Sequence, residues 1–175
     1  MIHLVGPGGA GKSTVAPLLA ARLGVRWADL DARFTAAHGC VDAFLAARGY
    51  GAYAATNVHV YLDLAAAADP VGVVALSSGF MTYPPDVHPR YPAIRGAIAA
   101  APTTVVLLPA LELEACVAET VRRQIGRGVG RMGAGRAEAK IRERFALYVA
   151  LLAPKVATTC SPEDVAAAIA ARLPR

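Results

Sequence analysis

The sequence predicts an α/β domain in which helices cover both faces of a parallel β-sheet. Short apolar runs alternate with helix-length amphipathic segments along the whole chain. Strands that are separated by helices pair in parallel, and the crossover helices cover the faces of the sheet. The length of 175 residues fits one domain with a full core. Because no internal repeat or linker divides the chain, we expect residues 1–175 to form a single domain.

The expected strands are short runs of apolar, often β-branched residues. They span residues 2–5, 25–28, 71–76, 103–108 and 155–158. The run 71–76 follows Asp69-Pro70, a dipeptide that favours a turn into the strand. The sequence therefore predicts a sheet of five parallel strands.

The expected helices have amphipathic patterns and recognisable ends. They span residues 12–23, 32–37, 41–47, 53–68, 93–100, 111–123 and 136–152, and a last helix starts at Pro162. Ser161 is expected as the N-cap of that last helix, with Pro162 at its first position.

Two segments are expected to be irregular. Residues 79–92 contain four prolines, and residues 126–135 contain five glycines. Long irregular segments in a compact domain often form lids or binding loops. We expect a lid at about residues 124–136.

Composition argues against a membrane protein and against a secreted one. Apolar residues make up 55% of the chain, but no run of about 18 uninterrupted apolar residues occurs, so no membrane span is expected. The N-terminus lacks the pattern of a signal peptide. Cys40, Cys116 and Cys160 are few and widely spaced, as in reduced cytosolic proteins. We therefore expect a cytoplasmic protein, either a monomer or a homodimer.

Positive charge is concentrated in one part of the chain. The formal net charge is +5, and seven arginines lie between Arg122 and Arg144, where only Glu138 and Glu143 oppose them. A basic cluster of this density binds nucleic acid or phosphate groups. No aromatic side chain for base stacking occurs there before Phe145. We therefore favour phosphate binding in the protein's own site and expect no nucleic-acid partner.

Residues 6–13, Gly-Pro-Gly-Gly-Ala-Gly-Lys-Ser, match the phosphate-binding pattern G-x-x-x-x-G-K-[ST] in full. The motif follows an expected strand and opens an expected helix, which is the context of a P-loop. Backbone N–H groups of such a loop surround the phosphates at the positive end of the helix. Lys12 is expected to reach the β- and γ-phosphates, and Ser13 to ligate Mg²⁺. The expected nucleotide contacts are Gly6, Gly8, Gly9, Ala10, Gly11, Lys12, Ser13 and Thr14.

Asp29 and Asp31 directly follow the second expected strand. In an open parallel sheet, ligands bind at the carboxyl ends of the strands. Two acids there can take different roles: Asp29 would hold Mg²⁺ through water, and Asp31 would orient or deprotonate an acceptor hydroxyl. The alternative is that Asp31 serves only as the N-cap of the following helix.

Taken together, these motifs resemble shikimate kinase. The resemblance rests on the early P-loop, on the D-x-D of residues 29–31, on the R-x-x-x-Y formed by Arg144 and Tyr148, and on Ser161-Pro162. It implies a P-loop kinase fold with a lid, and ATP and Mg²⁺ as cofactors. It also implies that Pro162 flanks the adenine and that Arg144 binds the acceptor's carboxylate. Asp31, Ser78 and Gly79 would complete the substrate site.

The lid arginine of that family has no clear counterpart here. The family's R-P-L-L sequence is absent. Arg123 and Arg127 are the nearest candidates for the catalytic arginine, and Arg131 is a third.

The sequence departs from the family pattern on the acceptor side. The family's G-E-x-x-F-R segment ends here at Ala54, so that the clamping arginine is missing, and the acid that follows it is Asn57. The G-G-G turn after the third strand reads Ser77-Ser78-Gly79, which offers two hydroxyls to an acceptor. An insertion of about ten residues follows, and its side chains are candidate acceptor contacts: Tyr83, His88, Arg90 and Tyr91.

Three hypotheses follow. The first is an ATP-dependent kinase that phosphorylates a hydroxyl of a small molecule other than shikimate, with Tyr50 and Tyr53 either lining the acceptor site or packing in the core. The second is a divergent shikimate kinase in which Arg90 or Arg95 replaces the lost clamp. The third is a non-catalytic nucleotide-binding module, which would have no need of Asp31.

Overall fold

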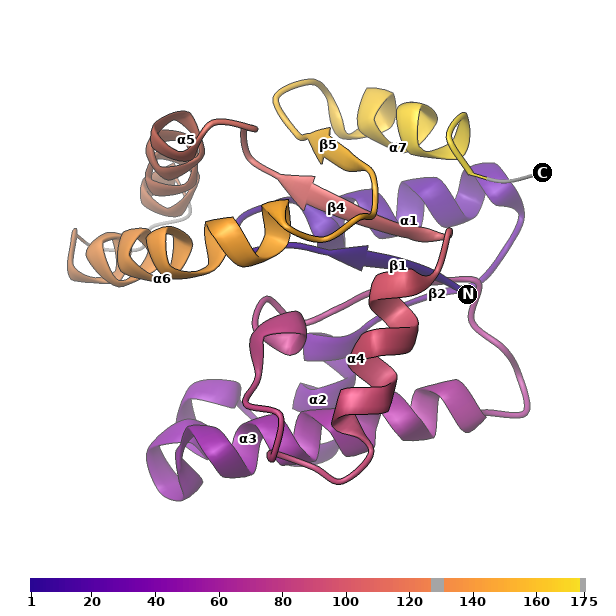
Figure 1. The fold of residues 1–175 in the computed structure, drawn as a ribbon, viewed down its shortest axis with the longest axis vertical. Coiled ribbons are helices and arrows are strands. Elements are labelled where there is room, and N and C mark those ends of the chain that lie inside the picture. Colours follow the sequence, from indigo (N-terminus) through magenta and orange to yellow (C-terminus); the bar gives the residue numbers. More distant parts are fainter. Residues whose placement is uncertain (127–130, 174–175) are drawn as a thin grey trace.

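The computed structural model describes residues 1–126 and 131–173, which build a parallel sheet between two layers of helices (Figure 1). The strands are β1 (Ile2–Val5), β2 (Trp27–Asp29), β3 (Val73–Ala75), β4 (Thr104–Leu108) and β5 (Lys155–Ala157). Their order across the sheet is β2-β3-β1-β4-β5, and every neighbouring pair is parallel. The predicted fold class and the five predicted strands are therefore confirmed, although β2, β3, β4 and β5 are shorter than expected.

Helices connect successive strands. They are α1 (Lys12–Leu23), α2 (Leu30–His38), α3 (Val41–Ala66), α4 (Tyr91–Ala100), α5 (Leu113–Gly126), α6 (Arg131–Val149) and α7 (Pro162–Ala170), with a short 3₁₀ helix, η1 (Phe80–Thr82), before α4. The Ser161 hydroxyl accepts a hydrogen bond from the backbone N–H of Asp164 at 3.1 Å, as its predicted role as N-cap requires.

Side chains of successive strand residues point to opposite faces of the sheet. In β1, Leu4 packs with α1 and α7, whereas Val5 packs with α3 and α4. In β4, Leu107 packs with α1 and α7, and Val106 packs with α3 and α4. Figure 1 shows α1 and α7 on one side of the sheet and α3 and α4 on the other.

Glycine shapes two of the helical segments. The two helices expected at 41–47 and 53–68 are both present, and they meet at a kink at Gly49 within the element labelled α3. Gly49 has φ 77°, a left-handed conformation that glycine adopts without steric cost, so that the chain bends and continues.

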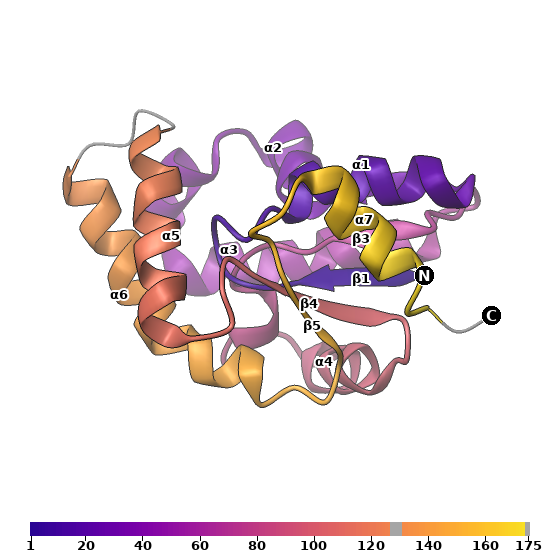
Figure 2. The ribbon, with the colours of Figure 1, turned by 90° about the horizontal axis from the view of Figure 1, so that it is seen from above.

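The glycine-rich segment is the second case. We expected residues 126–135 to be irregular, yet α5 runs through Gly126 and α6 begins at Arg131. Each glycine costs a helix only about 1 kcal/mol, and the two helices pack together around Cys116, Val117 and Ile141. Figure 2 shows α5 and α6 side by side at the end of the sheet where the strands finish. Arg127 and the centre of the expected lid lie outside the described residues.

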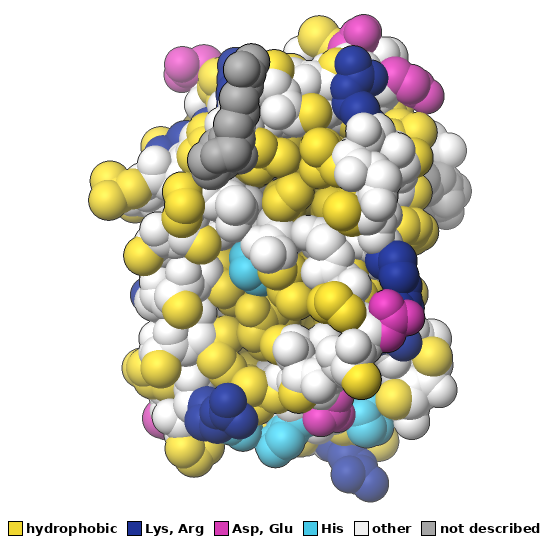
Figure 3. All heavy atoms as spheres, turned by 90° about the vertical axis from the view of Figure 1, so that its right-hand side faces the viewer, with side chains coloured by type: hydrophobic (Ala, Val, Ile, Leu, Met, Phe, Trp, Pro, Cys, Tyr) yellow, Lys and Arg dark blue, Asp and Glu magenta, His cyan; other side chains and the backbone are white. Residues whose placement is uncertain are grey.

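The opposite end of the molecule carries the chain termini (Figure 3). Hydrophobic side chains occupy much of this face, and the lysine and arginine side chains visible on it are scattered near its edges. The helices that carry the basic cluster, α5 and α6, lie at the other end of the sheet (Figure 2). Within the described parts of the chain, no helix has the length and apolar character needed to span a bilayer.

Candidate functional site

The loop between β1 and α1 is shaped by glycine. Gly6 has φ 144°, and a Cβ added there would lie 2.1 Å from the carbonyl oxygen of Leu107 in the neighbouring strand. Gly9 and Gly11 also have positive φ values, 79° and 86°. Only glycine adopts such conformations readily, so the sequence forces the backbone to curl around the start of α1. The resulting cavity of about 210 Å³, here called the phosphate-loop cavity, is lined by Gly8, Gly9, Ala10, Gly11, Lys12, Ser13, Thr14, Asp31 and Ser78.

Lys12 is buried in the wall of this cavity. Its ammonium donates hydrogen bonds to the carbonyl oxygens of Gly6 at 2.7 Å and Pro7 at 2.9 Å. Burial lowers the pKa of Lys12 to about 8, and the nearby carboxylates of Asp31 and Asp29 oppose that shift. A dry cation beside glycine N–H groups is a strong anion-binding arrangement.

The two acids after β2 have different surroundings. Oδ1 of Asp29 accepts a hydrogen bond from the backbone N–H of Ala32 at 3.0 Å, so Asp29, and not Asp31, is the N-cap of α2. Oδ1 of Asp31 accepts hydrogen bonds from the Ser77 hydroxyl at 2.5 Å and from the Tyr53 hydroxyl at 3.3 Å. The alternative of Asp31 as a mere helix cap is therefore wrong.

Mg²⁺ fits this set of groups. Ser13 and Asp31 line the same cavity, and the Asp29 carboxylate lies near enough to act on the pKa of Lys12. Mg²⁺ prefers hydroxyl and carboxylate oxygens and keeps several waters, so it needs only one or two protein ligands. Among residues 1–126 and 131–173, no group of three or more His, Cys, Asp or Glu side chains is placed to hold a metal ion.

A buried polar network supports Asp31 from behind. Asn57 is 0% exposed, and its side-chain nitrogen lies 2.7 Å from the Ser77 hydroxyl, 2.9 Å from that of Tyr83 and 3.1 Å from that of Tyr53. Burial raises the pKa of both tyrosines, so their hydroxyls stay protonated. From the sequence, Asn57 was noted only because it replaces an acid of the family pattern. The network around it depends on tertiary contacts that no local pattern reveals.

A second cavity opens between α3 and α6. This α3–α6 cavity has a volume of about 310 Å³ and is lined by Asp31, Val41, Asp42, Leu45, Tyr50, Tyr53, Ser78, Gly79, Lys140 and Arg144. It brings together the four residues that were predicted to bind substrate, and it includes both tyrosines that the sequence left undecided. Asp42 and Lys140 were not predicted.

Arg144 is fixed in the wall of the α3–α6 cavity. Its guanidinium donates hydrogen bonds to the Tyr50 hydroxyl at 3.2 Å and to the carbonyl oxygen of Ser78 at 3.4 Å. The Tyr148 hydroxyl donates to the same carbonyl at 2.7 Å. The R-x-x-x-Y pattern thus places both side chains on the turn after β3, because residues four apart share one face of a helix.

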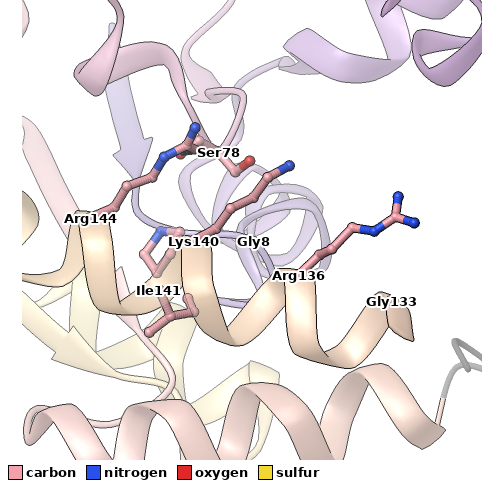
Figure 4. Close-up of a pocket in the computed structure, with 8 residues that line it drawn as sticks. Gly8, Ser78, Gly133, Arg136, Lys140, Ile141 and Arg144 are labelled. Atoms are coloured by element: carbon pink, nitrogen blue, oxygen red, sulfur yellow. Dashed lines mark hydrogen bonds between the residues drawn. The ribbon is translucent and has the colours of Figure 1, made fainter. Parts of the chain in front are cut away.

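A third cavity, the α6–loop cavity, lies between α6 and the P-loop (Figure 4). Its volume is about 240 Å³, and its lining is Pro7, Gly8, Ser78, Gly133, Arg136, Lys140, Ile141 and Arg144. Figure 4 shows Lys140 and Arg144 extending from α6 toward Ser78, while the guanidinium of Arg136 points away from them. Ser78 lines all three cavities, so they meet at the turn after β3.

Arg123 lies on the far side of the P-loop. Its guanidinium donates hydrogen bonds of 2.9 Å to the carbonyl oxygen of Gly9 and to the Thr158 hydroxyl, and it pairs with Glu119 at 2.7 Å. It lines a pocket of about 200 Å³ between α1 and α7, together with Pro162, Thr14 and other residues. Arg123 does not line the cavities that contain Asp31. Arg127, the other catalytic candidate, is outside the described residues.

The position of the family's clamping arginine is closed. Ala54 is 0% exposed and packs in the core. The one arginine of α3, Arg48, lies over the Phe44 ring at 5.5 Å and does not line the cavity. Arg95 donates to the carbonyl oxygen of Met81 at 2.9 Å, and neither it nor Arg90 lines the cavity, so neither replaces the clamp in this conformation.

The insertion after β3 packs inward instead of covering the cavity. The Tyr91 hydroxyl donates to the carbonyl oxygen of Phe80 at 2.6 Å and accepts from the backbone N–H of Tyr83 at 3.1 Å, and all three rings are buried. His88 stacks edge-on against His59 at the surface. Tyr83, His88 and Tyr91, which were expected to contact the acceptor, do not line the α3–α6 cavity. The Tyr83 hydroxyl instead contacts the side chain of Asn57.

Comparisons with known proteins find the same fold in shikimate kinases. A shikimate kinase from Acinetobacter baumannii, solved with shikimate, superposes with a TM-score of 0.74 at 21% identity, covering 97% of this chain and 89% of that one. Shikimate kinase from Bacteroides thetaiotaomicron superposes with a TM-score of 0.70 at 18% identity, covering 96% of this chain and 94% of that one. Shikimate kinase from Aquifex aeolicus superposes with a TM-score of 0.63 at 20% identity, covering 97% of this chain and 93% of that one. No curated protein sequence matches significantly. The profile of the family described as shikimate kinase matches residues 8–172, nearly the full length, and the chain therefore belongs to the shikimate kinase family.

Proposed function

We propose that this protein transfers the γ-phosphate of ATP to a hydroxyl of a small molecule, and that this acceptor differs from shikimate. Kinases of this family use ATP, so the phosphotransferase class rests on family membership. The observation that carries the altered acceptor is the buried Ala54, which leaves α3 without a cation toward the α3–α6 cavity.

In this proposal the nucleotide phosphates occupy the phosphate-loop cavity. Lys12 neutralises charge on the β- and γ-phosphates, and Ser13 and Asp29 would hold Mg²⁺, which would supply further positive charge to the phosphates. Arg123 and Pro162 line the pocket beyond the loop, where they contact the nucleoside. In this proposal Arg123 binds the nucleotide and does not stabilise the phosphoryl group during transfer.

Transfer takes place where the cavities meet. Asp31 and Ser78 line both the phosphate-loop cavity and the α3–α6 cavity, so an acceptor hydroxyl at Asp31 faces the γ-phosphate. The bond from the γ-phosphorus to the ADP oxygen breaks, a bond to the acceptor oxygen forms, and the hydroxyl proton passes to Asp31. Hydrogen bonds from Ser77 and Tyr53 hold the carboxylate in place during this step.

The chemistry of the α3–α6 cavity describes the acceptor. Arg144 and Lys140 lie on its α6 side, Asp31 and Asp42 supply two carboxylates, and the phenol of Tyr50 is already bonded to Arg144. Losing one arginine–carboxylate pair in a dry site costs a ligand about 2–5 kcal/mol. An acceptor with several hydroxyls and a single anionic group suits this lining better than one that needs two guanidinium clamps.

Shikimate itself is the second candidate. Two observations favour it: family membership, and the presence of Arg144 in the cavity wall beside Asp31. A non-catalytic role has no such support, because Asp31 sits in a network that a nucleotide-binding module has no need to maintain.

The experiment is an ADP-release assay with purified protein, MgATP and a panel of hydroxylated metabolites that includes shikimate. Asp31→Asn serves as the blank, since it keeps the shape of the site and loses the base. We expect an acceptor other than shikimate to give the highest turnover, and that signal to vanish in Asp31→Asn. The proposal fails if shikimate is the best acceptor, or if no panel member raises ADP release above that with water.

A further inference from the structure

Three cations recur at every fourth position along α6: Arg136, Lys140 and Arg144. This spacing puts them on one face of the helix. Ile141 and Tyr148 are buried beneath the helix and fix how it lies against the rest of the protein. The cationic row therefore has a set position, running from the P-loop toward the turn after β3 (Figure 4).

Lys140 is the member of this row at the junction of the cavities. It lines both the α6–loop cavity, with Gly8 of the P-loop, and the α3–α6 cavity, with Asp31. Its side chain extends toward Ser78, which also lines the phosphate-loop cavity (Figure 4). A phosphoryl group that passes from the P-loop to a hydroxyl at Asp31 travels along this junction.

The guanidinium of Arg136 points away from Lys140 (Figure 4), and three other nearby arginines are already engaged. Arg144 is bonded to Tyr50 and to Ser78, and Arg142 faces the other way and pairs with Glu114 and Glu138. Arg123 is tied to Thr158 and Glu119 behind the P-loop. Across residues 1–126 and 131–173, no carboxylate lies within ion-pair distance of the Lys140 ammonium. Lys140 is exposed and able to move its charge onto a substrate.

We propose that Lys140 is a catalytic residue that stabilises the phosphoryl group during transfer, in place of the lid arginine whose motif this chain lacks. The inference rests on the proposed phosphotransferase activity and is independent of which acceptor is used. The transferring group carries its negative charge on three equatorial oxygens, and a cation beside them lowers the barrier. Lys140 forms no covalent bond, and its long flexible stem lets the ammonium follow the group.

The test uses a mimic of the transferring group, so no acceptor need be known. MgADP affinity is measured by calorimetry with and without aluminium fluoride, which supplies a planar anionic analogue of the phosphoryl group. We expect aluminium fluoride to tighten MgADP binding by wild type at least about tenfold. Lys140→Met should lose most of that gain while binding MgADP alone within about twofold of wild type.

Two further variants serve as controls. Lys140→Arg keeps the charge and should retain most of the gain. Lys155→Met removes a lysine at the start of β5, where its ammonium contacts the carbonyl oxygen of Leu151, and should behave like wild type. Unchanged thermal melting of Lys140→Met shows that the fold is intact, as expected for an exposed side chain.

Several results overturn the assignment. These are a full aluminium fluoride effect in Lys140→Met, an equal loss in Lys140→Arg, or no aluminium fluoride effect in wild type. A Lys140→Met enzyme that only raises the KM of the acceptor would make Lys140 an acceptor clamp instead. Efficient phosphorylation of shikimate would defeat the altered-acceptor proposal and leave this one standing, so the two fail separately.

Discussion

The Ser77 hydroxyl donates a hydrogen bond of 2.5 Å to Oδ1 of Asp31, and the same hydroxyl lies 2.7 Å from the side-chain nitrogen of Asn57. Ser77 is 2% exposed, so its hydroxyl is committed to the carboxylate and does not face an acceptor. Of the two serine hydroxyls that the sequence offered for acceptor binding, only that of Ser78 reaches the cavities.

Ser77→Ala should therefore lower kcat without changing ATP binding. Without this hydrogen bond, Asp31 samples other orientations, and a misplaced base costs about tenfold in rate, or 1.4 kcal/mol. Ser78→Ala is the matched comparison and should mainly raise the KM of the acceptor. Steady-state kinetics with the best acceptor of the panel measures both, and the same effect in both variants would contradict this division of roles.

Lys12 makes ATP binding depend on pH. Its pKa is lowered to about 8 by burial, and bound phosphates raise that pKa because they favour the charged lysine. Affinity for MgATP should be constant below pH 8 and fall as the pH rises above it, by about tenfold between pH 7 and pH 9. Calorimetry at both values tests this. Lys12→Met should bind weakly and lose this pH dependence, and equal wild-type affinities at pH 7 and 9 would rule the account out.

The same shift acts on stability with the opposite slope. Since the pKa is about 8 in the folded protein and 10.5 in the unfolded chain, the unfolded chain binds more protons between these values. The free energy of unfolding should therefore rise as the pH increases from 8 to 10.5, as far as Lys12 alone contributes.

Asn57→Leu tests the buried network directly. The substitution keeps the volume and leaves the hydroxyls of Ser77, Tyr53 and Tyr83 without their shared partner. Ser77 and Tyr53 still donate to Asp31, but the loss of three hydrogen bonds and the unpaired Tyr83 hydroxyl should lower the free energy of unfolding by about 2–4 kcal/mol. Urea unfolding gives the value. Tyr83→Phe removes a single hydroxyl and should cost about 1 kcal/mol; equal stabilities for wild type and Asn57→Leu would show that the network contributes nothing.

Asp29→Asn separates metal binding from helix capping. Asparagine caps a helix as well as aspartate does, so the stability of the protein should change by less than about 0.5 kcal/mol. A charge that holds Mg²⁺ is lost, however, and half-maximal activity should require several-fold more Mg²⁺. A Mg²⁺ titration of activity at saturating ATP tests this. An unchanged titration curve would show that Asp29 only caps the helix and does not bind Mg²⁺.

Local patterns predicted the P-loop and the residues that line its cavity. The P-loop is contiguous, and its glycines are needed where φ is positive, as at Gly6 and Gly11. Asp29 and Asp31 could be placed because they directly follow a strand. The cap at Ser161 is equally local.

The acceptor half depends on contacts between distant segments. Lys140 is an exposed cation on a helix, a position usually occupied by solvated side chains, and only the packing of α6 across the P-loop brings it to the cavities. Tyr83 and Asn57 are 26 residues apart, and their contact requires α3 and the insertion to meet. The glycines of residues 126–135 also concealed the true start of α6 at Arg131.

The most direct test of the account is the steady-state rate of shikimate phosphorylation with saturating MgATP, compared with that of the best acceptor in the panel. Because α3 offers no cation to the cavity, kcat/KM for shikimate should be at least about a hundredfold lower, a difference of about 2.7 kcal/mol. A kcat/KM for shikimate near about 10⁵ M⁻¹s⁻¹, ordinary for an efficient enzyme, would contradict the altered acceptor and make this protein a shikimate kinase in activity as well as in family.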